Sequence, residues 1–189
     1  MNERQDFDRP TRQEDEYFHR RDRELLEQAR RAEAVVQERQ ALSAALGITD
    51  EALLQRLQAL QVTADNAWLL SWLPAIQIAW LKGLSGGERQ WLLDHIREKR
   101  GSIDEATASR LDGWLATKPD DGLFAAARAA LVTRIGALAP AARAAATADV
   151  LDAARGVAGA SGGILGVGSV SSDERAALEA LARDLGATT

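Results

Sequence analysis

The two histidines, His19 and His95, are the first candidates for acid–base catalysis or metal binding. Neither has a His or Glu at the spacing of an HExxH site or a zinc quartet. His95 follows Trp91 in an amphipathic segment, where a half-exposed structural role is commoner than catalysis. The chain has no cysteine, which excludes thiolate nucleophiles, disulfides and cysteine zinc sites.

Two further patterns bear on chemistry. The glycine-rich stretch 156–169 lacks the Lys-Ser/Thr and the preceding strand of a phosphate-binding loop, so it predicts a flexible turn between two helices. Carboxylates are scattered without a pair whose separation the sequence fixes; they include Asp94, Asp112, Asp149 and Asp152. The sequence therefore predicts no catalytic residue, no metal-binding residue and no cofactor, and indicates a protein that is not an enzyme.

The chain has five tryptophans, Trp68, Trp72, Trp80, Trp91 and Trp114. Such residues can stack on nucleic-acid bases, but their helical spacing and acidic neighbours favour packing in a core or a groove. The formal net charge of −5 disfavours nucleic acid as a partner. The polar start is unlike a secretion signal, and no apolar run reaches the roughly 20 residues of a membrane span. We expect a cytoplasmic protein without a transmembrane span.

The amino-terminal segment cannot be buried in a hydrophobic core. Half of residues 1–40 are charged, and few large apolar residues offset them. We expect a disordered tail over residues 1–12 and a long charged helical arm over residues 13–46, which contain no glycine or proline. Phe18, Leu25 and Ala32 recur every seven residues, and Val35 and Leu42 form a second such series. Arg21 and Gln28 interrupt this seam.

The arm has two interpretations, a solvated helix laced with ion pairs or a helix that binds a protein partner. Adjacent aromatic residues at the start of a charged helix are hard to cover within one chain and are common anchors at interfaces. The predicted partner-binding residues are Glu14, Glu16, Tyr17, Phe18, Arg21, Leu25 and Leu26.

Residues 47–189 predict a compact helical domain. Gly47 suits a helix end, Asp50 precedes a short helix, and Val62-Thr63 breaks it.

The segment 68–82 is the most apolar and predicts a central core helix with Pro74 in its first turn. Ser followed three residues later by Glu predicts capped helix starts at Ser85/Glu88, Ser102/Glu105 and Ser171/Glu174, with helices over 85–100, 103–116 and 172–185. Pro119-Asp120 and Pro140 mark two more helix starts.

The domain also contains a degenerate internal duplication. Gly83-Leu84-Ser85-Gly86-Gly87-Glu88-Arg89 is repeated loosely as Gly162-Gly163-Ile164 followed by Ser171-Ser172-Asp173-Glu174-Arg175. Each copy indicates a helix, a glycine turn and a capped helix. The predicted fold is all-α: a compact bundle of two pseudo-repeated helical hairpins with a long charged amino-terminal helix.

These hairpins resemble the tellurite-resistance TerB-like family over roughly residues 65–186. The resemblance implies an all-helical scaffold, no established enzymatic activity and an association with stress and tellurite resistance in bacteria. The family's suspected metal-binding aspartate in the turn is replaced by Lys82 in the first copy and by Ser161 in the second. We therefore expect the scaffold without the metal, with Glu88 and Glu174 as capping residues.

The arm is similar to the inhibitory segment of mitochondrial ATP synthase inhibitor proteins, because Glu14-Asp15-Glu16-Tyr17-Phe18 is followed by Arg20, Arg21, Arg23, Glu24 and Leu26. The leading hypothesis is a non-enzymatic, stress-associated interaction protein that binds a protein partner through its amino-terminal helix. One alternative is an inhibitor or regulator of a rotary ATP synthase that acts through the same helix. A second alternative is a stress protein that binds divalent metal.

Overall fold

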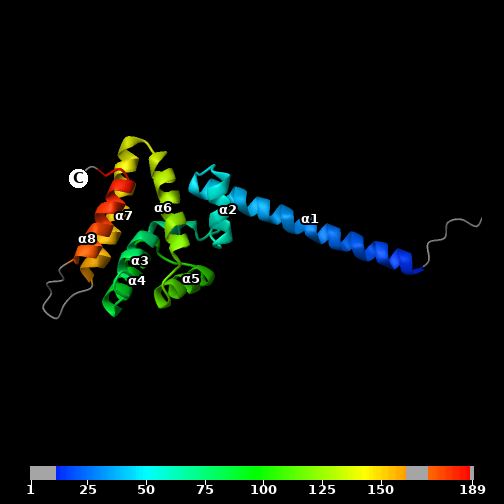
Figure 1. Cartoon of the computed structure of the whole chain (residues 1–189), viewed down its shortest axis with the longest axis horizontal. Helices are drawn as coiled ribbons and strands as arrows, with labels where there is room; N and C mark the ends of the chain where they lie inside the picture. Colours follow the sequence, from blue (N-terminus) through cyan, green and yellow to red (C-terminus); the bar gives the residue numbers. More distant parts are fainter. Residues whose placement is uncertain (1–11, 161–169, 188–189) are drawn as a thin grey trace, which may run out of the picture. The chain divides into compact units, whose positions relative to one another are not determined.

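The structure is a computed structural model that describes residues 12–160 and 170–187. The predicted all-α class is confirmed, since this part of the chain contains helices and no strand (Figure 1). In chain order the helices are α1 (Arg12–Leu46), α2 (Glu51–Ala59), the short 3-10 helix η1 (Ala67–Ser71), α3 (Leu73–Ala79), α4 (Gly86–Arg100), α5 (Glu105–Ala116), α6 (Asp121–Gly136), α7 (Pro140–Ala160) and α8 (Ser172–Asp184).

The chain divides into two compact units, residues 1–40 and residues 41–189. Residues 1–11 of the predicted tail over 1–12 lie outside the described residues, and α1 begins at Arg12, one residue before the predicted arm. In the first unit every described side chain from Tyr17 to Glu38 is exposed. Helix formation there rests on strong helix formers and on interactions one turn apart, such as the ion pair between Arg31 and Glu27 at 3.5 Å.

The core of the second unit begins with the last turn of α1. Leu42 and Leu46 are buried in it, together with Ile48 directly after the helix. Gly47 ends the helix with a φ of +66°, and its N–H donates to the Ser43 carbonyl at 2.8 Å. The hydrophobic core therefore includes residues from the end of the charged helix.

The apolar segment 68–82 does form the centre of the core, but not as one helix. The structure contains η1, then α3, which ends at Ala79 and not at Lys82. Pro74 explains the break at the start, because it has no N–H to donate to the carbonyl four residues earlier. At the other end, Gly83 adopts a φ of +90° and its N–H bonds the Trp80 carbonyl at 3.4 Å, so the chain turns away.

Two of the three predicted capping boxes are confirmed. Ser85 accepts the Glu88 N–H while the Glu88 carboxylate accepts the Ser85 N–H at 2.8 Å, and Ser171 and Glu174 make the same exchange. Both glutamates are buried. The box at Ser102 and Glu105 is wrong.

The actual cap of α5 is Asp104, which accepts the Thr107 N–H at 2.9 Å. A carboxylate is an equally good cap and lies directly before the first helical residue, so α5 begins two residues later than predicted. Hydrogen bonds from the side chain and then the backbone of Thr107 lower the pKa of the Asp104 carboxyl below its ordinary value.

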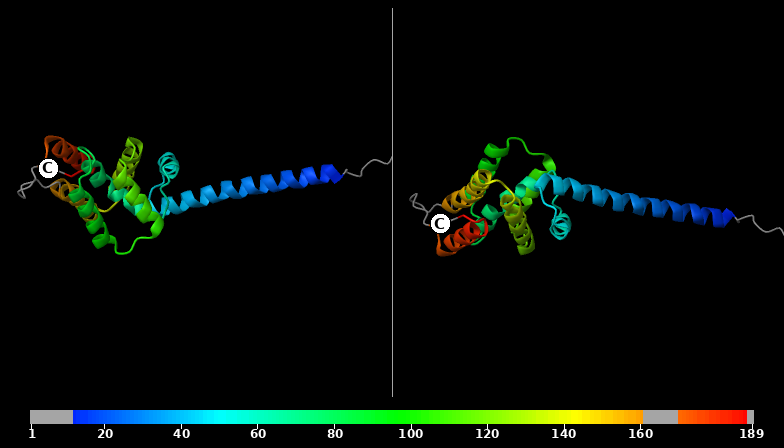
Figure 2. Two further views of the ribbon diagram at one scale, coloured as in Figure 1. Left: turned by 90° about the horizontal axis from the view of Figure 1, so that it is seen from below. Right: turned by 90° about the horizontal axis from the view of Figure 1, so that it is seen from above.

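The two predicted hairpins pack together. Helix α3 packs against α7 and α8, and α7 also packs against α4 and α8; the two further views show α7 and α8 side by side (Figure 2). Close packing needs glycine at two places. A Cβ at Gly87 would lie 2.8 Å from the Ala160 carbonyl oxygen, and a Cβ at Gly156 would lie 2.1 Å from Cζ2 of Trp91.

That packing corrects the expected glycine-rich turn. Residues 156–160 belong to α7, where Val157 and Ala158 are buried. Trp91 occupies the space that a side chain at position 156 would need, so this position of α7 requires glycine. The rest of the predicted turn, residues 161–169 with Ser161, lies outside the described residues.

Candidate protein-binding surface

Large apolar side chains that remain exposed are concentrated on α1. Among the residues whose side chains the structure describes, eight large hydrophobic residues are exposed, and six of these lie between positions 17 and 36. The exposed fractions reach 55% for Tyr17, 59% for Phe18, 53% for Leu25 and 57% for Leu26. The other two members on this helix are Val35 and Val36. Folding of the chain leaves this apolar area in water.

Helical geometry gathers most of these residues on one side of α1. At about 100° per residue, Phe18, Leu25 and Val36 point in nearly the same direction, and Tyr17 and Val35 lie together on the adjoining line. The Tyr17 and Phe18 rings meet edge to face with centroids 5.8 Å apart. We call these five residues the apolar stripe. It extends from the aromatic pair to the valine pair.

The other predicted binding residues take different places. Arg21 is exposed within the angular range of the stripe, whereas Leu26 lies about 80° from Phe18 and Val36, on the side away from Tyr17 and Val35. Glu14 and Glu16 are helical, and their side chains lie outside the described residues. Val36 belongs to the stripe but was not among the predicted binding residues. Its position eighteen residues, or five turns, after Phe18 was the signal that could have found it.

Polar interactions flank the stripe. Gln37 donates to the Glu33 carboxylate at 3.3 Å, and the Arg23 guanidinium donates to the His19 carbonyl at 3.1 Å. Such exposed contacts one turn apart stabilise a helix by only a few tenths of a kcal/mol each. These contacts do not involve the side chains of the apolar stripe.

The scattered carboxylates of the second unit are used in ion pairs. Asp112 pairs with Arg89 at 3.3 Å, and Asp149 pairs with Lys99 at 3.2 Å. Asp94 and Asp152 pair within their own helices with Arg97 and Arg155. No group of three or more His, Asp or Glu able to hold a metal ion occurs among the residues that the structure describes.

His95 and the tryptophans have packing roles, as predicted. The His95 ring stacks on Trp91 with centroids 3.8 Å apart, and its Nδ1 lies 3.0 Å from the Trp91 carbonyl oxygen. Trp72 is buried, and the other four tryptophans pack partly buried against the core. Trp80 donates its indole N–H to the Trp114 carbonyl at 3.0 Å. These contacts leave the tryptophans dispersed through the core instead of forming a stacking platform.

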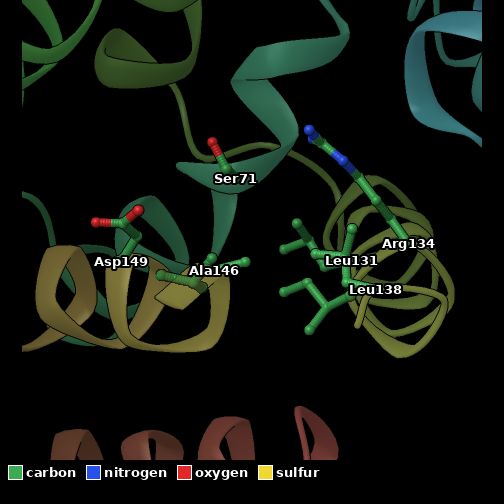
Figure 3. A pocket seen from close by; sticks show the side chains of 8 residues that line it. Ser71, Leu131, Arg134, Leu138, Ala146 and Asp149 are labelled. Carbon is green, nitrogen blue, oxygen red and sulfur yellow. The ribbon is translucent and has the colours of Figure 1, made fainter. Parts of the chain in front are cut away.

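A cavity of about 220 Å³ opens between η1, α6 and α7 (Figure 3). Apolar side chains such as Leu131 and Leu138 form its floor, and Ser71, Arg134 and Asp149 stand at its edge. The Ser71 hydroxyl donates to the Trp68 carbonyl at 2.8 Å, and Asp149 is held by Lys99. Ser71 and Asp149 are thus engaged with neighbouring protein groups and do not form a nucleophile–base pair with each other.

A second cavity of about 410 Å³ lies along α7 and the end of α8. Arg143 and Arg155 line it. Arg143 donates to the Gly136 and Leu138 carbonyls, and Arg155 pairs with Asp152. Both cations therefore already have protein partners.

Comparisons with protein-family models, curated proteins and solved structures find no match to this chain. None of the helices in the described ranges is both long and apolar enough to cross a membrane.

Proposed function

We propose that this chain is a non-enzymatic interaction protein that binds a protein partner through the apolar stripe of α1. One observation carries the proposal: six of the eight exposed large hydrophobic side chains, among those described, lie on a single helix. Exposed apolar residues that gather on one surface, bordered by polar groups, mark interaction sites in soluble proteins. Scattered single residues would carry no such meaning.

The composition of the stripe supports this assignment. Tyr17 and Phe18 supply large, rigid anchors of the type that dominates binding energy at interfaces. Complete burial of one large apolar side chain stabilises a complex by roughly 1.5 to 3 kcal/mol, and about half of that remains available for side chains that are half exposed. The surrounding Arg and Glu residues would form the polar rim.

The resemblance to the TerB-like family extends the proposal to the role of the second unit and to the cellular process in which the protein acts. The confirmed capping boxes at Ser85 and Ser171 support two similar helix starts within the second unit. On that basis the second unit serves as a helical scaffold in a cytoplasmic, stress-associated protein. Loss of the gene should then sensitise cells to tellurite, and restoration by a chain with Tyr17→Ala and Phe18→Ala should fail.

Site-specific photo-crosslinking in cells tests the binding function. A photoreactive residue at Leu25, in the stripe, should capture a protein, whereas the same residue at Ala34, on the opposite side of α1, should not. Ala34 is a matched control because it is exposed on the same helix. Equal capture at both positions, or none at either, would refute the proposal.

The crosslinked partner also separates the alternative assignments. Capture of a subunit from a rotary ATPase would favour the regulator, and a peptide of residues 10–35 should then slow ATP hydrolysis. Replacing Tyr17 and Phe18 by alanine should remove that effect.

A further inference from the structure

The order of residues along α1 indicates which partner fits the stripe. The seven-residue seam has Phe18, Leu25 and Ala32 at one core position of a two-helix pairing, and Arg21, Gln28 and Val35 at the other. A partner helix must accommodate Arg21 and Gln28 as well as the apolar residues. The direction of the partner decides whether this is possible.

A second copy running parallel and in register is disfavoured. Each core residue would then face its own counterpart, so Arg21 would face Arg21 across the seam. Two like charges in that position repel each other and would both lose solvent.

An antiparallel second copy resolves the conflict. With the two helices centred between Leu26 and Glu27, Phe18 faces Val35 of the other copy, and Tyr17 lies level with Val36. Arg21 faces the small Ala32, which leaves room for the Arg21 stem to cross the seam and keep its guanidinium in water. Gln28 faces Leu25.

The spacing of exposed residues has the symmetry that such a pairing requires. In a two-fold interface, residue i of one copy contacts residue j of the other and the reverse contact also occurs. The aromatic pair 17–18 and the valine pair 35–36 are equidistant from the midpoint of residues 26 and 27, so each aromatic pair meets a valine pair. A partner of unrelated sequence would not require this palindromic order.

The charges beside the seam are complementary in the same arrangement. Glu24 and Arg31 each precede a core residue, at positions that face each other across an antiparallel pair, offset by two residues or about 3 Å along the axis. The symmetry creates the contact twice. Arg31 now pairs with Glu27 of its own helix at 3.5 Å, with both side chains largely exposed, so this weak pair can be exchanged for Glu24 of a second copy.

We infer that the partner of the apolar stripe is a second copy of this chain, and that residues 17–36 of the two copies form an antiparallel two-helix interface. The inference rests on the proposed function, because it names the partner of the same surface. The protein would then be a homodimer whose seam accommodates Arg21 and Gln28.

Charge reversal in the full-length chain provides the first test, read by sedimentation velocity over a wide concentration range. The wild-type chain should dimerise, and Glu24→Arg or Arg31→Glu alone should weaken the dimer by about tenfold, because each change turns two attractive contacts into repulsive ones. An equimolar mixture of these two variants should regain wild-type affinity as a heterodimer. Arg30→Glu, with the same charge change on the outer side of the helix, is the matched control and should have little effect.

Disulfide formation then reports direction, because the chain has no native cysteine. Arg21→Cys mixed with Ala32→Cys should give a disulfide between the two variants. Arg21→Cys alone should not crosslink to itself, and a self-crosslink there would overturn the antiparallel arrangement.

A wild-type chain that stays monomeric at every concentration would overturn the inference. The crosslinking experiment at position 25 then decides whether the proposed function still holds. Capture of a different protein would leave the proposed function standing, whereas no capture at all would remove both.

Discussion

At the scale of single residues, Gly156 allows α7 to pack against the Trp91 ring. An added methyl group would lie 2.1 Å from Cζ2 of Trp91, well inside van der Waals contact. We predict that Gly156→Ala lowers the free energy of unfolding by about 1 to 3 kcal/mol, as overpacked positions do. Gly159→Ala is the control on the same helix, since its Cβ would meet nothing within 4 Å. Urea denaturation of both variants measures the difference, and equal stabilities would contradict the packing.

Two serines that look equivalent in the sequence have different roles. Ser85 caps α4, so Ser85→Ala should cost about 1 kcal/mol of stability. Ser102 does not cap α5, and Ser102→Ala should change stability by less than about 0.5 kcal/mol. A large loss at Ser102 in thermal unfolding would show that the predicted capping box forms after all.

The Asp104 cap predicts a pH dependence. Because hydrogen bonds from Thr107 lower the pKa of Asp104 in the folded chain, its charged form contributes stability above the unfolded value of 3.8. That contribution is lost as the pH falls through the lower folded pKa. The difference in melting temperature between the wild type and Asp104→Asn should therefore shrink in acid. A difference independent of pH would contradict the assignment.

At the scale of elements, α1 combines two kinds of surface. Its last turn contributes Leu42, which is fully buried, whereas Leu25 is 53% exposed. Leu42→Ala should destabilise the fold by about 2 to 5 kcal/mol, the range for large-to-small changes in a core. Leu25→Ala should leave stability within about 0.5 kcal/mol of the wild type. Chemical denaturation followed by tryptophan fluorescence distinguishes them, and a comparable loss for both would contradict this division.

Helix starts were largely predictable from the sequence, because caps and prolines act through neighbouring backbone groups. Asp50, Ser85, Asp120 and Ser171 all cap the helices that follow them. The error at Ser102 arose because two possible capping residues lie two positions apart, and Asp104 is the one that caps α5. The need for glycine at position 156 was not predictable, since it comes from Trp91, which is distant in sequence.

The row of exposed apolar side chains on α1 was predictable in part, because spacing along a helix is a local property of the sequence. Tyr17, Phe18 and Leu25 follow from helical spacing and a charged background alone. Leu26 was predicted with them and is also exposed, but it lies on the opposite side of Phe18 from Tyr17 and Val35. Val36 was missed because its relation to Phe18 extends over five turns.

At the scale of the whole molecule, the chain combines a helical domain with a helix whose large apolar side chains are exposed. In the homodimer that we infer, the domains would be joined through the stripe, and its formation would depend on protein concentration. Salt should weaken the dimer modestly, because the flanking pairs of Glu24 and Arg31 are exposed and screened.

The most direct test of the central claim is hydroxyl-radical footprinting of the full-length chain at low and high concentration. Labelling of Tyr17, Phe18, Leu25, Val35 and Val36 should fall as the complex forms. Leu81 and Val132, the two exposed large hydrophobic residues described outside α1, should keep their labelling and serve as internal controls. Unchanged labelling along α1, or protection confined to Leu81 and Val132, would contradict the stripe as the interaction surface.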